Sequence, residues 1–444
     1  MKTIFYSKNV FYQNKFHKGN LIVENDKIID FIYGDILDNA ISYENDYIIP
    51  GLVDTHVHVN EPGRTDWEGF ETATKSALAG GITTLVDMPL NCIPVTTSRY
   101  ALELKMREIK NKLHTDCGFW GGIIPNNESN LEELLNSGVL GCKAFLIHSG
   151  IDDFPKVNEE DLRKSIPIMK KYDLPILIHA ELESFEGQTE NYNNPRSYSA
   201  FLNSRPKEIE DNAIKLMIKL CKEFDAHIHI VHLSSANSID LIKKAKEEGL
   251  RFSVETCPHY LAINAEEIQD GQTIYKCCPP IREKNNNDLL WEAIKNGIID
   301  IIVSDHSPCT ANLKLIEKGD IEHAWGGISS LQFSFSIVWT EFKKRNLPLE
   351  LLIKLMCKNT SKLIKKENIK GSIDKNYFAD FIVWNPNEKF KVTKDIIFHK
   401  NKETPYLGRE LFGKVKKVYL RGKLVFDENK FSNPLGNFIL NEVI

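Results

Sequence analysis

The sequence predicts an α/β fold: a closed (β/α)8 TIM barrel with a small β-sandwich domain formed from both chain ends. Eight short apolar runs alternate with amphipathic, helix-period stretches between residue 50 and about residue 310. Polar side chains of metal-binding types recur at the ends of these runs. Eight strands that alternate with helices are typical of a closed parallel barrel, which carries its chemistry at the carboxyl ends of the strands.

The eight expected strands are short and rich in β-branched residues. The segments between them, such as 206–223 and 236–248, carry apolar residues at three- and four-residue spacing and predict amphipathic helices. A doubly wound open sheet is the alternative, but such a sheet gathers its site at one switch point, whereas here polar residues follow most strands. The strands are expected at 51–58, 83–88, 117–124, 141–147, 175–180, 227–233, 251–257 and 299–304.

The two ends of the chain differ from the middle. Residues 1–50 and 371–444 contain short alternating runs and no long helical stretch. We therefore expect both ends to pair into one small β domain beside a barrel of residues 51–370. The polar stretches 186–205 and 309–326 are expected to be long loops over the mouth of the barrel.

Composition excludes several classes of function. The formal net charge of the 444 residues is -5, which provides no basic field for nucleic acid. The nine cysteines are odd in number and irregularly spaced, which argues against a disulfide framework and for a reducing compartment. No apolar run is long enough to span a bilayer, and the first residues form no signal peptide. We expect a cytoplasmic protein with no membrane partner.

The pair His56 and His58 stands at the end of the first expected strand. Side chains alternate along a strand, so a His-x-His pair aims two imidazoles at one point. An isolated histidine in a strand is more often a buried core residue. Here, however, Lys143, His179, His232 and Asp305 also lie in or just after later strands, which indicates one shared site at the barrel rim.

The sixth expected strand holds three histidines. Alternation places His232 on one face with Ile228 and Ile230, and it places His227 and His229 on the other. We expect His232 to face the barrel axis because it stands at the carboxyl end, and we expect His227 and His229 to be structural.

Imidazoles and a carboxylate suit Zn2+ better than Mn2+, Co2+ or Fe2+. Four such ligands could hold one metal ion. Lys143 lies in a mostly apolar run, where it either extends to water or has a lowered pKa and captures CO2 as a carbamate. In the second case Lys143 is an N6-carboxylysine whose oxygens bridge two divalent metal ions.

Taken together, these segments resemble the amidohydrolase superfamily, in its cyclic-amidohydrolase branch of dihydroorotases, hydantoinases and allantoinases. The resemblance covers nearly the whole chain and includes residues 48–58 and 371–384. Within this branch the motifs are most similar to those of allantoinases. The motifs that carry this similarity are residues 60–70, 87–91, 279–282, 304–309 and 326–328.

The resemblance implies a hydrolase that opens the hydantoin ring of allantoin and releases allantoate. It implies that a hydroxide bridging two metals attacks a ring carbonyl, and that Asp305, also a metal ligand, moves the proton to the leaving nitrogen. We expect Asn91 and Ser307 to hydrogen-bond the substrate ring, and we expect Asn60 to be a third substrate-binding residue. The resemblance also implies a homotetramer.

Two positions, Asn60 and His148, depart from relatives in the branch. Dihydroorotases carry an arginine where this chain has Asn60, and a neutral side chain here favours an uncharged substrate. Hydantoinases usually carry a tyrosine where this chain has His148, whose role stays open. The roles of Cys277 and Cys278, in a segment that lines the pocket in relatives, also stay open. Another cyclic amidase and a non-catalytic relative are the alternative functions.

Overall fold

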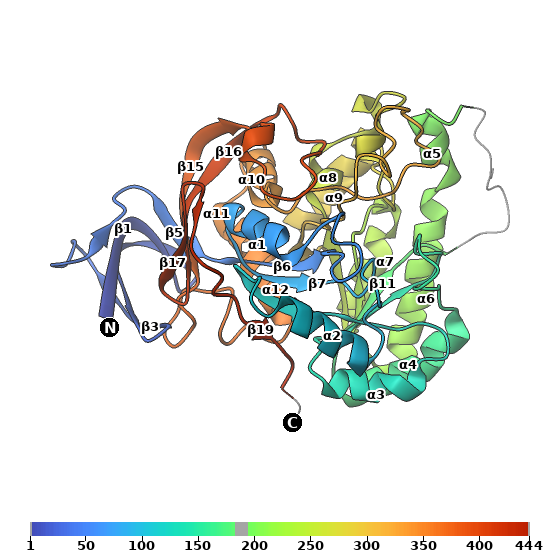
Figure 1. The fold of residues 1–444 in the computed structure, drawn as a ribbon, viewed down its shortest axis with the longest axis horizontal. Coiled ribbons are helices and arrows are strands. Elements are labelled where there is room, and N and C mark those ends of the chain that lie inside the picture. Colours follow the sequence, from blue (N-terminus) through green and yellow to red (C-terminus); the bar gives the residue numbers. More distant parts are fainter. Residues whose placement is uncertain (1, 183–193, 443–444) are drawn as a thin grey trace.

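The computed structural model describes residues 2–182 and 194–442, and it confirms the predicted fold class (Figure 1). Each barrel strand runs parallel to its neighbours. A parallel bridge between Val57 and His306 closes the ring between the first and last strands. The strands are β6 (Leu52–Val57), β7 (Ile82–Asp87), β8 (Asp116–Phe119) continued by β9 (Gly121–Gly122), β10 (Cys142–Phe145), β11 (Ile176–His179), β12 (Ile228–Ile230), β13 (Phe252–Thr256) and β14 (Ile301–Ile302).

Amphipathic helices cover the outside of the barrel, as their apolar spacing predicts (Figure 1). The predicted helical segments 206–223 and 236–248 form α6 (Lys207–Phe224) and α7 (Ile239–Glu247). The other main helices are α1 (Phe70–Ala79), α2 (Arg99–Ile109), α3 (Glu128–Asn136), α4 (Glu159–Lys171), α9 (Lys284–Lys295), α10 (Ser334–Lys344), α11 (Leu349–Ile353) and α12 (Asn359–Leu363).

Strands from the two chain ends form one nine-stranded sheet beside the barrel (Figure 1). The ends meet where β5 (Tyr47–Pro50) pairs antiparallel with β15 (Phe381–Lys391). Side chains from both halves of the sheet enclose a separate small core, which includes Phe5 and Phe381. The remaining strands are β1 (Lys2–Tyr12), β2 (Lys15–Glu24), β3 (Lys27–Tyr33), β4 (Ile41–Ser42), β16 (Glu410–Leu420), β17 (Lys423–Asp427) and β18 (Lys430–Phe431).

A buried ionic cluster joins the small sheet to the barrel. The Lys370 ammonium lies 2.7 Å from Asp116, at the start of β8, and 2.6 Å from Asp380, just before β15. Arg421 also pairs with Asp116, at 2.6 Å. Beyond the sheet the chain returns to the barrel, where β19 (Phe438–Ile439) pairs in parallel with β8. The C-terminal segment therefore packs against both parts of the fold.

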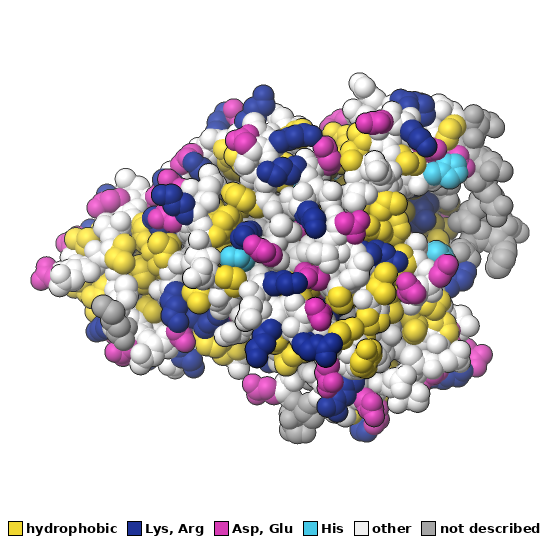
Figure 2. Space-filling view, viewed as in Figure 1, with side chains coloured by type: hydrophobic (Ala, Val, Ile, Leu, Met, Phe, Trp, Pro, Cys, Tyr) yellow, Lys and Arg dark blue, Asp and Glu magenta, His cyan; other side chains and the backbone are white. Residues whose placement is uncertain are grey.

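The two stretches expected over the barrel mouth differ in structure. Residues 186–193 lie outside the described residues, and the rest of the first stretch contains the short helix α5 (Tyr198–Ser204). The second stretch, 309–326, is a series of turns. No helix of the described residues is both long and apolar enough to cross a membrane. Charges of both signs are intermixed on the face shown in Figure 2.

Candidate metal centre

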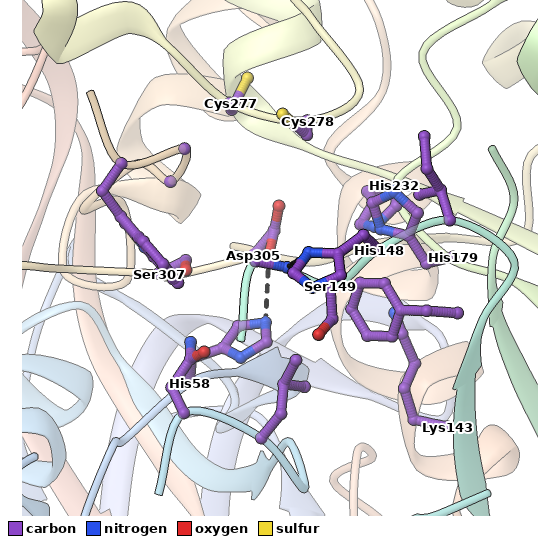
Figure 3. A pocket seen from close by; sticks show the side chains of 18 of the residues that line it. His58, Lys143, His148, Ser149, His179, His232, Cys277, Cys278, Asp305 and Ser307 are labelled. Atoms are coloured by element: carbon purple, nitrogen blue, oxygen red, sulfur yellow. Dashed lines mark hydrogen bonds and ion pairs between the residues drawn. The ribbon is translucent and has the colours of Figure 1, made fainter. Parts of the chain in front are cut away.

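A cavity of about 140 Å³ opens at the carboxyl ends of the barrel strands. A cavity of about 150 Å³ holds a molecule the size of benzene, so this space suits a small heterocycle. Figure 3 shows the side chains that line it, from strands and loops far apart in sequence. The residues predicted for the site that line this cavity are His56, His58, Asn91, Lys143, His179, His232, Asp305 and Ser307.

His56 and His58 leave β6 beside Asp305. The Asp305 carboxylate lies 3.2 Å from Nε2 of His56 and 3.7 Å from Nε2 of His58. Asp54 links the first and last barrel strands beside this pair, because its carboxylate accepts hydrogen bonds from the backbone amides of His56 at 3.1 Å and Ser304 at 3.1 Å. The three facing side chains are spaced as ligands of one metal ion would be.

His179 and His232 form the opposite wall of the cavity (Figure 3). Their ring centroids are 4.5 Å apart, and that of His232 lies 5.4 Å from the His56 ring. Nε2 of His179 donates to Glu181 at 2.7 Å, and Arg205 donates to the same carboxylate at 2.7 Å. Because Nε2 is engaged in this way, Nδ1 is the ring nitrogen of His179 that could coordinate a metal ion.

Lys143 projects from β10 into the base of the cavity with no exposed surface. The first of the two alternatives for Lys143, a side chain that extends to water, is therefore wrong. Among the described residues Nζ has no hydrogen-bond partner, and it lies 4.9 Å from the Phe145 ring. Burial lowers the pKa of Lys143 to about 7, against the weaker opposing effect of Glu255 and Asp305. A neutral amine is the form that captures CO2.

Glu255 is a residue of this site that the sequence prediction missed. Its buried carboxylate, on β13, accepts a hydrogen bond from Nδ1 of His56 and one from the backbone amide of His232 at 3.3 Å. The partner histidines hold the pKa of Glu255 well below its usual range. A carboxylate inside a strand of the barrel interior costs free energy unless it is paired, and that cost was the signal in the sequence that could have identified Glu255.

The sixth strand differs from the alternation expected for it. The pairing register places His229 beside Leu177, which is itself paired with Lys143, so His229 shares the interior face. Nε2 of His229 donates to Glu255 at 2.9 Å. His232 lies beyond the regular strand with a left-handed φ of 40°, which breaks the alternation and turns its ring toward the cavity. Both histidines therefore serve the site, one directly and one through Glu255.

Of the expected substrate contacts, Asn91 and Ser307 line the cavity, whereas Asn60 does not. The Asn60 side-chain amide donates to the Pro308 carbonyl at 3.3 Å, and its backbone has a left-handed φ of 58°. The structure therefore places Asn60 behind the wall, where it contacts the loop that follows Asp305.

The residues whose roles were left open lie at the rim of the cavity. His148 is exposed, and its Nε2 lies 3.4 Å from Asp152. Cys277 is buried and Cys278 is half-buried, and both line the cavity above Asp305 in Figure 3. The cavity also includes Trp325, at the end of the second mouth stretch.

The fold combines a (β/α)8 barrel with a β domain formed by both chain ends, and a cluster of histidines with an aspartate lies at the barrel mouth. Together these features define a hydrolase of the TIM-barrel class. Residues 47–425 match the Amidohydrolase family, and the chain belongs to this family.

Among curated proteins, the chain is similar to allantoinases from three kingdoms. It is 46% identical to the allantoinase of Streptomyces avermitilis, over 90% of this chain and 88% of that protein. It is 46% identical to the Arabidopsis thaliana allantoinase, over 89% and 80%. It is 42% identical to the Saccharomyces cerevisiae allantoinase, over 89% and 86%.

Solved structures share the fold over the whole length. The L-hydantoinase (dihydropyrimidinase) of Arthrobacter aurescens superposes with a TM-score of 0.91 at 25% identity, covering 99% of both chains. The dihydropyrimidinase of Brevibacillus agri superposes with a TM-score of 0.89 at 24% identity, also covering 99% of both chains.

Proposed function

We propose that this protein is an allantoinase, which hydrolyses the hydantoin ring of allantoin to allantoate. The observation that carries the proposal is its near full-length similarity to allantoinases of a bacterium, a plant and a yeast. The cavity supports it, because it is small and contains both hydrogen-bonding groups and candidate metal ligands.

We propose that two divalent metal ions, with Zn2+ preferred, belong to the site. His56, His58, His179, His232 and Asp305 would hold them, and Lys143 as an N6-carboxylysine would contribute oxygens to both. The buried, unpartnered Nζ of Lys143 in the described structure fits this assignment, since a carbamate would give the side chain the contacts that it lacks. The ions, when bound, supply Lewis acidity that polarises a carbonyl and lowers the pKa of water.

The protein's own residues would position the substrate and move the proton. Asp305 lies beside His56 and His58 and lines the cavity, where its carboxylate can accept the proton of the attacking water and return it to the leaving ring nitrogen. Burial raises the pKa of Asp305, which favours proton acceptance. Asn91 and Ser307 would hydrogen-bond the polar edges of the ring.

The cavity wall also supports a neutral substrate. Arg205 is the one arginine among the described residues that line the cavity, and it donates to the buried carboxylate of Glu181 at 2.7 Å, so its charge is balanced inside the protein. Asn60 stands where dihydroorotases carry an arginine, and it lies behind the wall. An acidic ring such as dihydroorotate would therefore meet little uncompensated positive charge from these two positions.

The test is a comparison of four substrates with one metal-analysed preparation. We expect turnover of allantoin to exceed that of hydantoin, dihydropyrimidine and dihydroorotate at equal enzyme concentration. If hydantoin or dihydropyrimidine is turned over faster than allantoin, the protein has the activity of its structural relatives instead. Absence of turnover of all four by a preparation with two metals per chain would contradict a cyclic amidase.

We propose further that the enzyme acts as a homotetramer in the cytoplasm, on a small molecule and without nucleic acid or membrane. Light scattering of the purified chain measures the assembly, and fractionation of the source cells measures the location. A monomer or a membrane-bound fraction would contradict these two assignments.

A further inference from the structure

A second cluster of metal-binding side chains shares Asp305 with the histidine pair. Cys257 follows β13, His259 stands in the first turn of α8 (Pro258–Ala262), and Asp305 follows β14. One ligand atom from each of the three lies within 4.8 Å of the other two. The same spacing relates His56, His58 and Asp305, so the two clusters share one carboxylate.

His259 is the observation that points to a ligand. Its side chain has no exposed surface, and neither ring nitrogen has a hydrogen-bond partner in the described part of the chain. A buried polar group without a partner costs about 1–3 kcal/mol, which makes two such atoms on one ring unusual. A cation at the cluster would give one of these nitrogens a partner.

The surroundings of the cluster favour a cation. Asp305, Glu255 and Asp54 all lie close enough to Cys257 to interact with it electrostatically. Cys257 and His259 are fully buried, whereas Asp305 lines the cavity, so an ion would arrive past Asp305. Sulfur, nitrogen and oxygen donors together suit a thiophilic divalent ion better than a hard ion such as Mg2+.

We propose that Cys257, His259 and Asp305 form a third metal position, which binds a thiophilic divalent cation such as Cd2+. The Cys257 thiol releases its proton to solvent as the metal–sulfur bond forms, and no electron is transferred. One consequence rests on the proposed function: an ion bound here engages the carboxylate of Asp305 and inhibits turnover.

The test is a titration of the metal-loaded enzyme with cadmium chloride, followed by the ultraviolet absorption of the cadmium–thiolate bond. We expect one equivalent of cadmium to produce this band in the native protein and none in Cys257→Ser. Cys278→Ser is the matched control, because it removes another thiol at the same cavity, and it should keep the full band. No band in the native protein, or a band lost in Cys278→Ser and kept in Cys257→Ser, would overturn the proposal.

His259→Gln provides a second variant that keeps the thiol. We expect it to retain the band with an apparent cadmium affinity at least about tenfold weaker, because loss of a direct ligand should cost no less than the loss of a group that only supports a ligand. Unchanged affinity in a folded His259→Gln protein would remove His259 from the site. Circular dichroism of each variant verifies that it is folded.

Metal analysis and activity separate the two claims. Cadmium should bind while the original metal content stays constant, and release of one resident ion per cadmium bound would overturn the third position. If cadmium binds in this way and allantoin turnover falls in the native protein but not in Cys257→Ser, both claims stand. Binding without any loss of turnover supports the metal position and overturns its effect on Asp305. The cadmium–thiolate band can be measured even if the protein turns over none of the cyclic amides, so the binding result does not depend on the proposed function.

Discussion

Glu255 accepts a hydrogen bond from Nδ1 of His56, and its other carboxylate oxygen accepts one from Nε2 of His229 at 2.9 Å. A carboxylate only accepts, so the proton of His56 stays on Nδ1 and the lone pair of Nε2 faces the cavity. His229 is fixed in turn, because its Nδ1 lies 2.8 Å from the Ser253 hydroxyl. His56, a candidate metal ligand on the first strand, is thus oriented by side chains of the sixth and seventh strands.

Glu255→Gln should weaken metal binding without unfolding the protein. The amide nitrogen of glutamine is a donor and would oppose one of the two imidazole N–H groups that Glu255 accepts. We expect a loss of about 10–100-fold in metal affinity, measured as metal retained against a competing chelator. The exposed Glu350→Gln is the control and should retain metal like the native protein. Equal retention by both variants would contradict the orienting role of Glu255.

Lys143→Ala should lose metal and activity together. The variant lacks the only amine at the described cavity that could form a bridging carbamate. Short-chain carboxylic acids such as propionate can place a carboxylate in the vacated space, so we expect partial rescue of both quantities. The measurements are metal per chain and allantoin turnover with and without the acid. Two metals per chain and full turnover in Lys143→Ala would refute the bridging lysine.

Reconstitution of the metal-free enzyme should depend on pH through Lys143. Burial lowers the pKa of this lysine from its ordinary value to about 7, so the neutral amine predominates above that pH. Only the neutral amine attacks CO2, so activity regained per unit time with excess Zn2+ and fixed dissolved CO2 should rise as the pH passes through about 7. A flat profile, or a rise only near pH 10, would show that Lys143 titrates as an ordinary lysine.

Asp305→Asn should separate metal binding from turnover. The amide keeps one oxygen beside His56 and His58 but cannot accept the proton of the attacking water. We expect substantial metal content and a fall in kcat of about 10²–10⁴-fold, the usual contribution of general acid–base catalysis. The assay follows kcat and metal content on the same sample. Native kcat in the variant would exclude Asp305 from proton transfer.

Lys370→Met should destabilise the contact between the small sheet and the barrel. The substitution leaves the buried carboxylates of Asp116 and Asp380 without their shared ammonium, although Arg421 still reaches Asp116. Breaking a buried ion pair costs about 3–5 kcal/mol. Urea unfolding measures the change in the free energy of unfolding. Lys389→Met, which breaks the exposed pair with Glu410, is the control and should cost about 1 kcal/mol or less. Equal losses in both variants would mean that the buried cluster has no special role.

The fold was predictable because its signals are local. Metal-binding side chains lie in or just after several apolar runs of the barrel, and the runs alternate with helices such as α6 and α7, whose apolar spacing is visible in a short window of sequence. Strand lengths were less predictable. The last barrel strand, expected at 299–304, is regular only at Ile301–Ile302, because Ser304 is held by Asp54 rather than by a strand partner. The return of β19 to the barrel depends on contacts between Phe438 and a strand more than 300 residues earlier.

The sequence by itself determined which side chains meet at the barrel mouth. All strands of a parallel barrel end at the same rim. His56, His179 and Asp305 could therefore be assigned to the site from their positions at or near the ends of the apolar runs. The tertiary structure alone decided how these groups are oriented and supported. Glu255 on His56, the left-handed turn at His232 and the displacement of Asn60 behind the wall depend on hydrogen bonds and backbone angles between distant segments. Such contacts leave no periodic trace in one chain, because periodicity records which face a residue occupies and not which neighbour it meets there.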